Sequence, residues 1–111
     1  MIPKRVYIAG PYTGDEAANV RAAIEAAEFV RNAGHVPFVP HLMHFWGLQH
    51  PRPYGDWLAQ CLVWLACCEA VLRLPGHSAG ADVEVATAAK LGIPVFHAPL
   101  DLIHAYRESR R

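Results

Sequence analysis

A short segment, residues 78–84, carries the side chains that are best suited to catalysis. The run from Ser78 to Glu84 places Ser78 and Gly80 at a predicted helix start and Glu84 one turn later. Glu84 shares a helix face with Ala88, whereas Asp82 points elsewhere. With valines on both sides, Glu84 should be only partly solvated, which suits a carboxylate for nucleophilic or acid–base work. Alternatively, both acids merely favour the positive end of the helix dipole.

A glycine-containing turn near the N-terminus is the second candidate. It comprises Gly10, Pro11, Tyr12, Thr13 and Gly14, and it separates a predicted strand from a predicted helix. The backbone N–H groups of such a turn, together with the helix N-terminus, could bind an anion such as phosphate. The turn matches neither of the familiar phosphate-loop patterns, so a plain Gly-Pro turn is the alternative.

Residues 40–55 hold three prolines and three histidines, a composition that predicts a long and functional loop. His41 and His44 are spaced closely enough to suggest a metal ion, but no fourth ligand has matching spacing. We therefore expect no metal and interpret these histidines as hydrogen-bonding groups of a pocket or as loop surface. Trp46 and Tyr12 are candidates for an aromatic wall against a nucleobase.

A strongly apolar helix is predicted at residues 57–68, with Asp56 as its N-cap. Such a helix must be covered on more than one side, so Trp57 and Trp64 are expected in the core or in a subunit interface. Cys61 is expected to be a small buried hydrophobic residue, because no basic neighbour is evident on its helix.

Alternating strands and helices predict the fold. Strands are expected at residues 5–9, 35–39, 70–74 and 93–97, and further helices at 15–32, 81–91 and 100–107. This order predicts a single α/β domain over residues 1–111, a flavodoxin/Rossmann-like three-layer sandwich with a four- or five-stranded parallel sheet and helices on both faces. In such folds the loops at the carboxyl ends of the strands form the ligand crevice.

Composition narrows the possible partners. Apolar residues make up 53% of the 111-residue chain and charged residues 18%, so part of the apolar surface should face another subunit, giving a homodimer or larger homo-oligomer. Ten basic and ten acidic residues balance, which argues against a nucleic acid polymer as partner. The early Gly-Pro turn and the lack of a long apolar stretch predict a cytoplasmic protein that does not span a membrane, with its three cysteines reduced.

Three segments together resemble a known family. These are residues 8–14 (Ile-Ala-Gly-Pro-Tyr-Thr-Gly), residues 74–84 (Leu-Pro-Gly-His-Ser-Ala-Gly-Ala-Asp-Val-Glu) and residues 92–96 (Gly-Ile-Pro-Val-Phe). They resemble the nucleoside 2-deoxyribosyltransferase superfamily, and within it the branch known as domain of unknown function 4406 (DUF4406). The resemblance implies a Rossmann-like and usually oligomeric enzyme, without a cofactor, that transfers or hydrolyses the N-glycosidic bond of nucleosides or nucleoside monophosphates.

The resemblance also implies roles for individual residues. Glu84 matches the nucleophile that attacks the anomeric carbon, and Ser78 matches a position that contacts the sugar or its 5′ substituent. The turn of residues 10–14, called the Gly10 turn below, matches the loop beside the sugar or its phosphate. One departure is at Cys61, where related enzymes carry an aspartate that assists the leaving base. Asp56, five residues earlier, is not an evident substitute. A nucleotide-binding or sensing module without turnover is therefore the alternative function, and a purely structural subunit is a third.

Overall fold

The computed structural model describes residues 2–107. Its sheet is built around β1 (Arg5–Ala9), which pairs with β2 (Val36–Phe38) on one side and β3 (Ala70–Arg73) on the other. β4 (Val95–Phe96) completes the order β2-β1-β3-β4, and every pairing is parallel. The predicted four-stranded alternative for the parallel sheet is confirmed.

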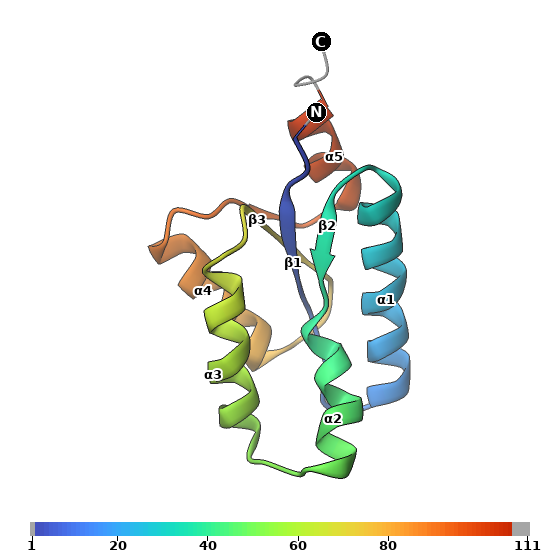
Figure 1. The fold of residues 1–111 in the computed structure, drawn as a ribbon, viewed down its shortest axis with the longest axis vertical. Coiled ribbons are helices and arrows are strands. Elements are labelled where there is room, and N and C mark those ends of the chain that lie inside the picture. The colour runs from blue at the N-terminus through green and yellow to red at the C-terminus, as the bar shows by residue number, and fades with distance from the viewer. Residues whose placement is uncertain (1, 108–111) are drawn as a thin grey trace.

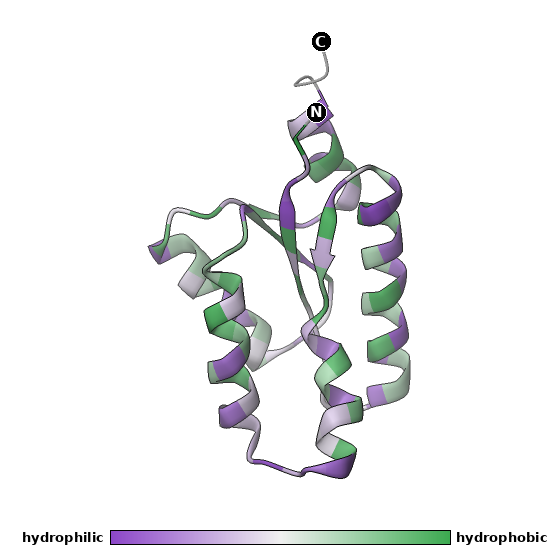
Figure 2. Ribbon diagram, viewed as in Figure 1, coloured by the Kyte–Doolittle hydropathy of each residue, from purple (hydrophilic) through white to green (hydrophobic). Residues whose placement is uncertain are grey.

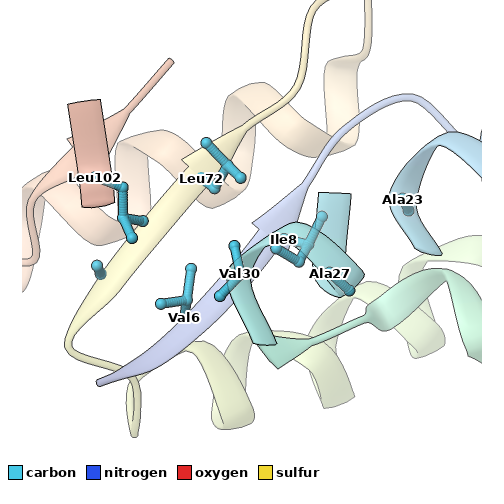
Figure 3. Packing of buried hydrophobic residues seen from close by; sticks show 8 residues of the cluster. Val6, Ile8, Ala23, Ala27, Val30, Leu72 and Leu102 are labelled. Atoms are coloured by element: carbon cyan, nitrogen blue, oxygen red, sulfur yellow. The ribbon is translucent and has the colours of Figure 1, made fainter. Parts of the chain in front are cut away.

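Helices cover both faces of the sheet because side chains alternate along the central strand. Val6 and Ile8 face α1 (Glu16–Asn32) and α5 (Pro99–Arg107), where Leu102 completes a buried cluster (Figure 3). Tyr7 and Ala9 face α3 (Tyr54–Leu65) and α4 (Ala79–Lys90) on the other side. The resulting three layers are visible in Figure 1, and they confirm the predicted sandwich.

The helix α1 shows how local sequence produces one of these layers. Asp15 is its N-cap, and the Asp15 carboxylate accepts a hydrogen bond from the Ala18 backbone N–H at 3.2 Å. Its buried residues, Val20, Ala23, Ala27 and Val30, follow helical spacing. Hydrophilic and hydrophobic bands alternate along the helix in Figure 2, as expected for a helix with one face on the core.

Residues 40–55 differ from the predicted long loop. They contain a 3₁₀ turn, η1 (Pro40–Leu42), followed by a short helix, α2 (Met43–Gln49). Pro40 occupies the first position of η1, where its missing N–H costs nothing, and Pro51 and Pro53 fall after α2 has ended. The prolines therefore bracket a helix here and do not exclude one.

The predicted N-cap role of Asp56 is also wrong. α3 begins at Tyr54 with Pro53 as its N-cap, so Asp56 lies exposed in the first turn. Its carboxylate still faces the positive end of the helix dipole, which is why an acid at this position mimics a cap in the sequence. α3 also ends at Leu65, three residues before the predicted end.

Across residues 2–107, no helix combines the length and apolar character needed to cross a membrane.

Candidate functional site

A cavity of about 370 Å³ lies beyond the carboxyl end of β1. Its wall comes from the turn after β1, from η1 and α2, from the connection between α2 and α3, and from the start of α3. Two further helices each add one acidic residue, Glu16 of α1 and Glu84 of α4. Figure 1 shows α2 and α3 extending past the sheet at this end of the molecule. The volume falls within the range of about 300–1,000 Å³ that small-molecule sites occupy.

Glu84 is the buried carboxylate of this cavity. Only 6% of the residue is exposed, and the Tyr7 hydroxyl donates a hydrogen bond to its Oε2. Burial raises the pKa of Glu84 to about 7, although the Tyr7 hydrogen bond and the positive charge of Arg73 act in the opposite direction. A carboxyl group with a pKa near neutrality can be populated as an acid or as a carboxylate at physiological pH.

The start of α4 explains how Glu84 reaches the cavity. Ser78 is the N-cap, and its hydroxyl accepts a hydrogen bond from the Ala81 backbone N–H at 3.0 Å. Glu84 and Ala88 are both buried on the inner face, whereas Asp82 is exposed and forms a 3.1 Å ion pair with Arg73. The predicted difference between the two acids of this helix is confirmed.

Cys61 lies on the α3 side of the same cavity and is 4% exposed. Burial, helped by the negative charge of Glu84, raises the pKa of the Cys61 thiol to about 11, while a hydrogen bond with Tyr7 acts in the opposite direction. The thiol is therefore neutral at physiological pH, in agreement with the prediction that Cys61 is a buried small residue and not a nucleophile.

Two histidines line the wall opposite α3. His44 Nδ1 shares a 2.6 Å hydrogen bond with the Tyr12 hydroxyl and lies 3.9 Å from Glu16 Oε1. The buried His41 donates from Nε2 to the Pro11 carbonyl oxygen at 3.0 Å, and burial lowers its pKa. Within residues 2–107, no three His, Cys, Asp or Glu side chains gather in a way that could hold a metal ion.

An arginine and two tryptophans pack together beside the cavity, and Arg52 and Trp57 belong to its lining. The Arg52 guanidinium carbon lies 5.0 Å from the ring centre of Trp57 and 5.5 Å from that of Trp46. The two indoles pack edge to face with centres 5.3 Å apart. Trp57 lines the cavity, although the sequence favoured a core or interface role, whereas Trp46 is half-exposed beside it and is not part of the lining.

The structure separates the predicted site residues into two groups. The cavity lining includes Gly10, Tyr12, Thr13, His44 and Glu84. The remaining residues lie outside the lining: Pro11, Gly14, Trp46, Asp56, Ser78 and Gly80. Some of these support the wall, since the Pro11 carbonyl holds His41 and Gly80 lies against the Tyr54 hydroxyl.

Sequence reasoning missed four residues that the site uses: Tyr7, Arg52, Tyr54 and Trp57. Tyr7 lies among the buried residues Val6, Ile8 and Ala9 of a parallel strand, where an aromatic side chain is expected in the core, so its hydroxyl does not stand out. Tyr54 and Arg52 lie in the segment that looked like a loop. Gly80 was the one indication in the sequence of the contact with Tyr54, because a glycine near a helix start can mark the close approach of another group.

Comparisons with known proteins support this architecture. The family profile described as a domain of unknown function, DUF4406, matches residues 4–97. Among curated protein sequences, no significant match to the chain is found.

Two solved structures have a similar fold. The first is a 2-deoxyribosyltransferase from the psychrotolerant bacterium Bacillus psychrosaccharolyticus, described as a biocatalyst for nucleoside synthesis, with 20% identity and a TM-score of 0.60; the match covers 82% of this chain and 69% of that one. The second is a conserved protein from Enterococcus faecalis V583, with 18% identity and a TM-score of 0.63. That match covers 85% of this chain but only 62% of the Enterococcus chain. The chain therefore belongs to the DUF4406 family and has the fold of a 2-deoxyribosyltransferase.

Proposed function

We propose that this protein binds a nucleoside or a nucleoside 5′-monophosphate and cleaves its N-glycosidic bond with Glu84 as nucleophile. One observation carries the proposal: Glu84 is a buried carboxyl group that opens onto the same cavity as the Gly10 turn. The similarity in fold to a 2-deoxyribosyltransferase supports the substrate class. The transferred group goes either to water, which gives a hydrolase, or to a second base, which gives a deoxyribosyltransferase.

The bond to the sugar is formed by this carboxylate. As the bond between C1′ and the base nitrogen breaks, its electron pair leaves with the base and the sugar develops oxocarbenium character. One oxygen of ionised Glu84 then bonds to C1′. Water or an acceptor base subsequently displaces the carboxylate at the same carbon. The Tyr7 hydroxyl, bonded to Oε2, holds the carboxylate in place and leaves Oε1 to face the sugar.

Residues of the cavity lining can be assigned to the parts of a nucleoside. Gly10, Tyr12, Thr13 and Trp57 all line the cavity. In this proposal the first three contact the sugar or a 5′ substituent, and the indole of Trp57 contacts the base. Asp15 already caps the N-terminus of α1. A 5′-phosphate would therefore depend on the backbone of the Gly10 turn more than on the dipole of that helix.

Release of free base tests the proposal. The protein is incubated with the four common 2′-deoxynucleosides and their 5′-monophosphates, and free base is measured by chromatography. We expect release from at least one of them, and a loss of at least about 1,000-fold in kcat/KM in Glu84→Gln, which keeps the size but removes the nucleophile.

Glu28→Gln is the matched control, because Glu28 is an exposed glutamate of α1, on the opposite side of the sheet from Glu84. Its activity should stay within about twofold of the wild type, since surface charges of this kind contribute little. Base release that survives in Glu84→Gln would refute the nucleophile assignment.

A nucleotide-binding or sensing role without turnover is the second candidate. It is favoured by one residue, Cys61, because its neutral thiol stands where the resembled enzymes carry an acid for the leaving base. A nucleotide that raises the melting temperature while no base is released would support this role, since binding to the native state alone stabilises a protein.

A further inference from the structure

The cavity lining contains an exposed cation, Arg52, that the proposed mechanism leaves without a role. Arg52 lies in the connection between α2 and α3, which is hydrophilic in Figure 2. Its guanidinium packs over two indoles, those of Trp46 and Trp57. Within the described chain only Nη1 donates a hydrogen bond, to the His50 carbonyl oxygen at 3.3 Å. A guanidinium has five N–H donors, so most of this fork is available to a ligand.

Aromatic packing fixes the direction of this fork. An unrestrained arginine side chain loses rotamer entropy when it binds a ligand. The contacts with Trp46 and Trp57 restrict Arg52 before any ligand arrives, and cation–π attraction favours that position. Arg52 therefore resembles a preorganised recognition group more than a free surface residue.

The leaving base needs help that Cys61 cannot give. Breaking the glycosidic bond places negative charge on the base, and this charge must be met by a proton or by a cation. A neutral thiol with a pKa of about 11 is a poor proton donor at physiological pH. A guanidinium can stabilise the same charge without transferring a proton, because it stays charged throughout the physiological range.

On the basis of the proposed glycosidic function, we propose that Arg52 binds the carbonyl oxygen of an oxo-substituted nucleobase and stabilises that base as it leaves as an anion. The electron pair of the C1′–N bond moves onto the ring nitrogen and is delocalised onto the carbonyl oxygen, while a Glu84 oxygen bonds to C1′. The released anion then takes its proton from water. An arginine fork pairs with the O6 and N7 acceptors of guanine, whereas adenine presents an amino donor at that edge.

The base is a better match for Arg52 than a 5′-phosphate is. Trp57 lines the cavity next to Arg52, and a flat indole suits a nucleobase but offers nothing to a phosphate. The Gly10 turn forms a separate part of the cavity lining and remains available for the 5′ side of the sugar.

The test compares two probes that differ in the charge of the leaving base. The base of 2′-deoxyguanosine leaves as an anion unless it is protonated, whereas 7-methyl-2′-deoxyguanosine is cationic and its base leaves neutral. In Arg52→Met we expect kcat/KM to fall about 100-fold for the first probe, the usual loss when one charge-stabilising donor is removed. For the methylated probe the change should be under about threefold, because no negative charge develops there and because the methyl group occupies N7, one of the two acceptors that pair with Arg52.

Matched variants separate this role from a general loss of structure and from contacts with other parts of the substrate. Arg31→Met removes an exposed arginine from α1 and should change neither probe. Equal losses for both probes in Arg52→Met would overturn the inference, as would no loss at all. So would a loss confined to the 5′-monophosphate, which would identify a phosphate contact. A probe-dependent loss in His44→Gln in place of Arg52→Met would assign the leaving group to a histidine acid and overturn it too.

A binding measurement makes failure of this inference distinguishable from failure of the proposed function. Calorimetry with free hypoxanthine, an oxo-substituted base, needs no turnover. Arg52→Met should weaken binding by about 10-fold or more, the usual scale for loss of an arginine–base pair, and Glu84→Gln should not. Hypoxanthine binding that is equally tight in Arg52→Met overturns the inference even if Glu84 proves essential. Base release that survives in Glu84→Gln overturns the proposed nucleophile, while Arg52-dependent binding would still support recognition of the base.

Discussion

The pair formed by Tyr7 and Glu84 combines two opposing effects on one carboxyl group. Burial disfavours the carboxylate and raises the pKa of Glu84 to about 7, whereas the Tyr7 hydrogen bond favours the carboxylate. The nucleophile must be ionised, so activity should rise with pH as Glu84 loses its proton and should level off above about pH 8. The same burial excludes water, which strengthens the interaction of the carboxylate with a developing positive sugar.

Removal of the Tyr7 hydroxyl should shift this pH dependence. Tyr7→Phe deletes the donor that lowers the pKa of Glu84, so that pKa should rise further and the midpoint of the kcat/KM profile should move to higher pH. A rise of one pKa unit would reduce activity about 10-fold at low pH and much less on the alkaline plateau. The profile is measured from about pH 5 to pH 9.

The control for this prediction is Tyr106→Phe. Tyr106 packs against the cluster on the opposite face of the sheet, so its replacement should leave the midpoint unchanged. An unchanged midpoint in Tyr7→Phe, or an equal loss of activity at every pH, would show that Tyr7 does not tune Glu84.

At the scale of elements, contact between two helices shapes the cavity. A Cβ atom on Gly80 of α4 would overlap the Tyr54 hydroxyl oxygen and lie 3.0 Å from the adjoining ring carbon. Tyr54 belongs to the first turn of α3 and lines the cavity. Gly80 therefore lets α3 and α4 approach closely at the point where the cavity wall is formed.

Gly80→Ala should lower the stability of the protein. The tyrosine ring must move, and overpacking of this kind costs about 1–3 kcal/mol, which is measurable as a lower melting temperature. Tyr54→Phe should recover part of the loss in the double variant, because it removes the atom that would clash most severely. Gly55→Ala is the control, since a Cβ atom at Gly55 would have no neighbour within 4 Å. A Gly80→Ala protein as stable as the wild type would show that Tyr54 is not held there.

The elements also show what sequence patterns can and cannot predict. β1 and β3 were predictable because short β-branched runs end at clear turn residues, and α1 because Val20, Ala23, Ala27 and Val30 follow helical spacing. Glu84 could be singled out because a lone acid between valines is unusual. α2 was missed because seven residues are too few to show a periodic pattern, and the surrounding prolines suggested a loop.

Contacts between distant segments were beyond the reach of these patterns. Tyr7 and Glu84 are 77 residues apart in the chain and meet only because α4 packs against the face of β1 that carries Tyr7. Arg52 and Trp57 line the cavity together with residues of η1 and α2, an arrangement that local sequence does not show. Tertiary packing, and not local sequence, decides these contacts.

At the scale of the whole molecule, topology places the site. In the order β2-β1-β3-β4 the connections reverse direction between β1 and β3, and ligands of open α/β sheets bind beyond the strand ends at such a point. The turn after β1 and the helix after β3 both line the cavity. A homo-oligomer stays a prediction, to which the exposure of Leu48, Val63 and Trp64 adds candidate contact residues.

The central claim is that a Glu84 oxygen becomes bonded to the anomeric carbon during the reaction. A nucleoside with fluorine at C2′ and a good leaving base tests it most directly. The electron-withdrawing fluorine slows both oxocarbenium-like steps, whereas the good leaving base speeds only the first, so the intermediate accumulates. Mass spectrometry of the acid-quenched and digested protein should find one fluorinated sugar on the peptide that contains Glu84, and none in Glu84→Gln. Base release with no adduct, or an adduct on another residue, would contradict the account.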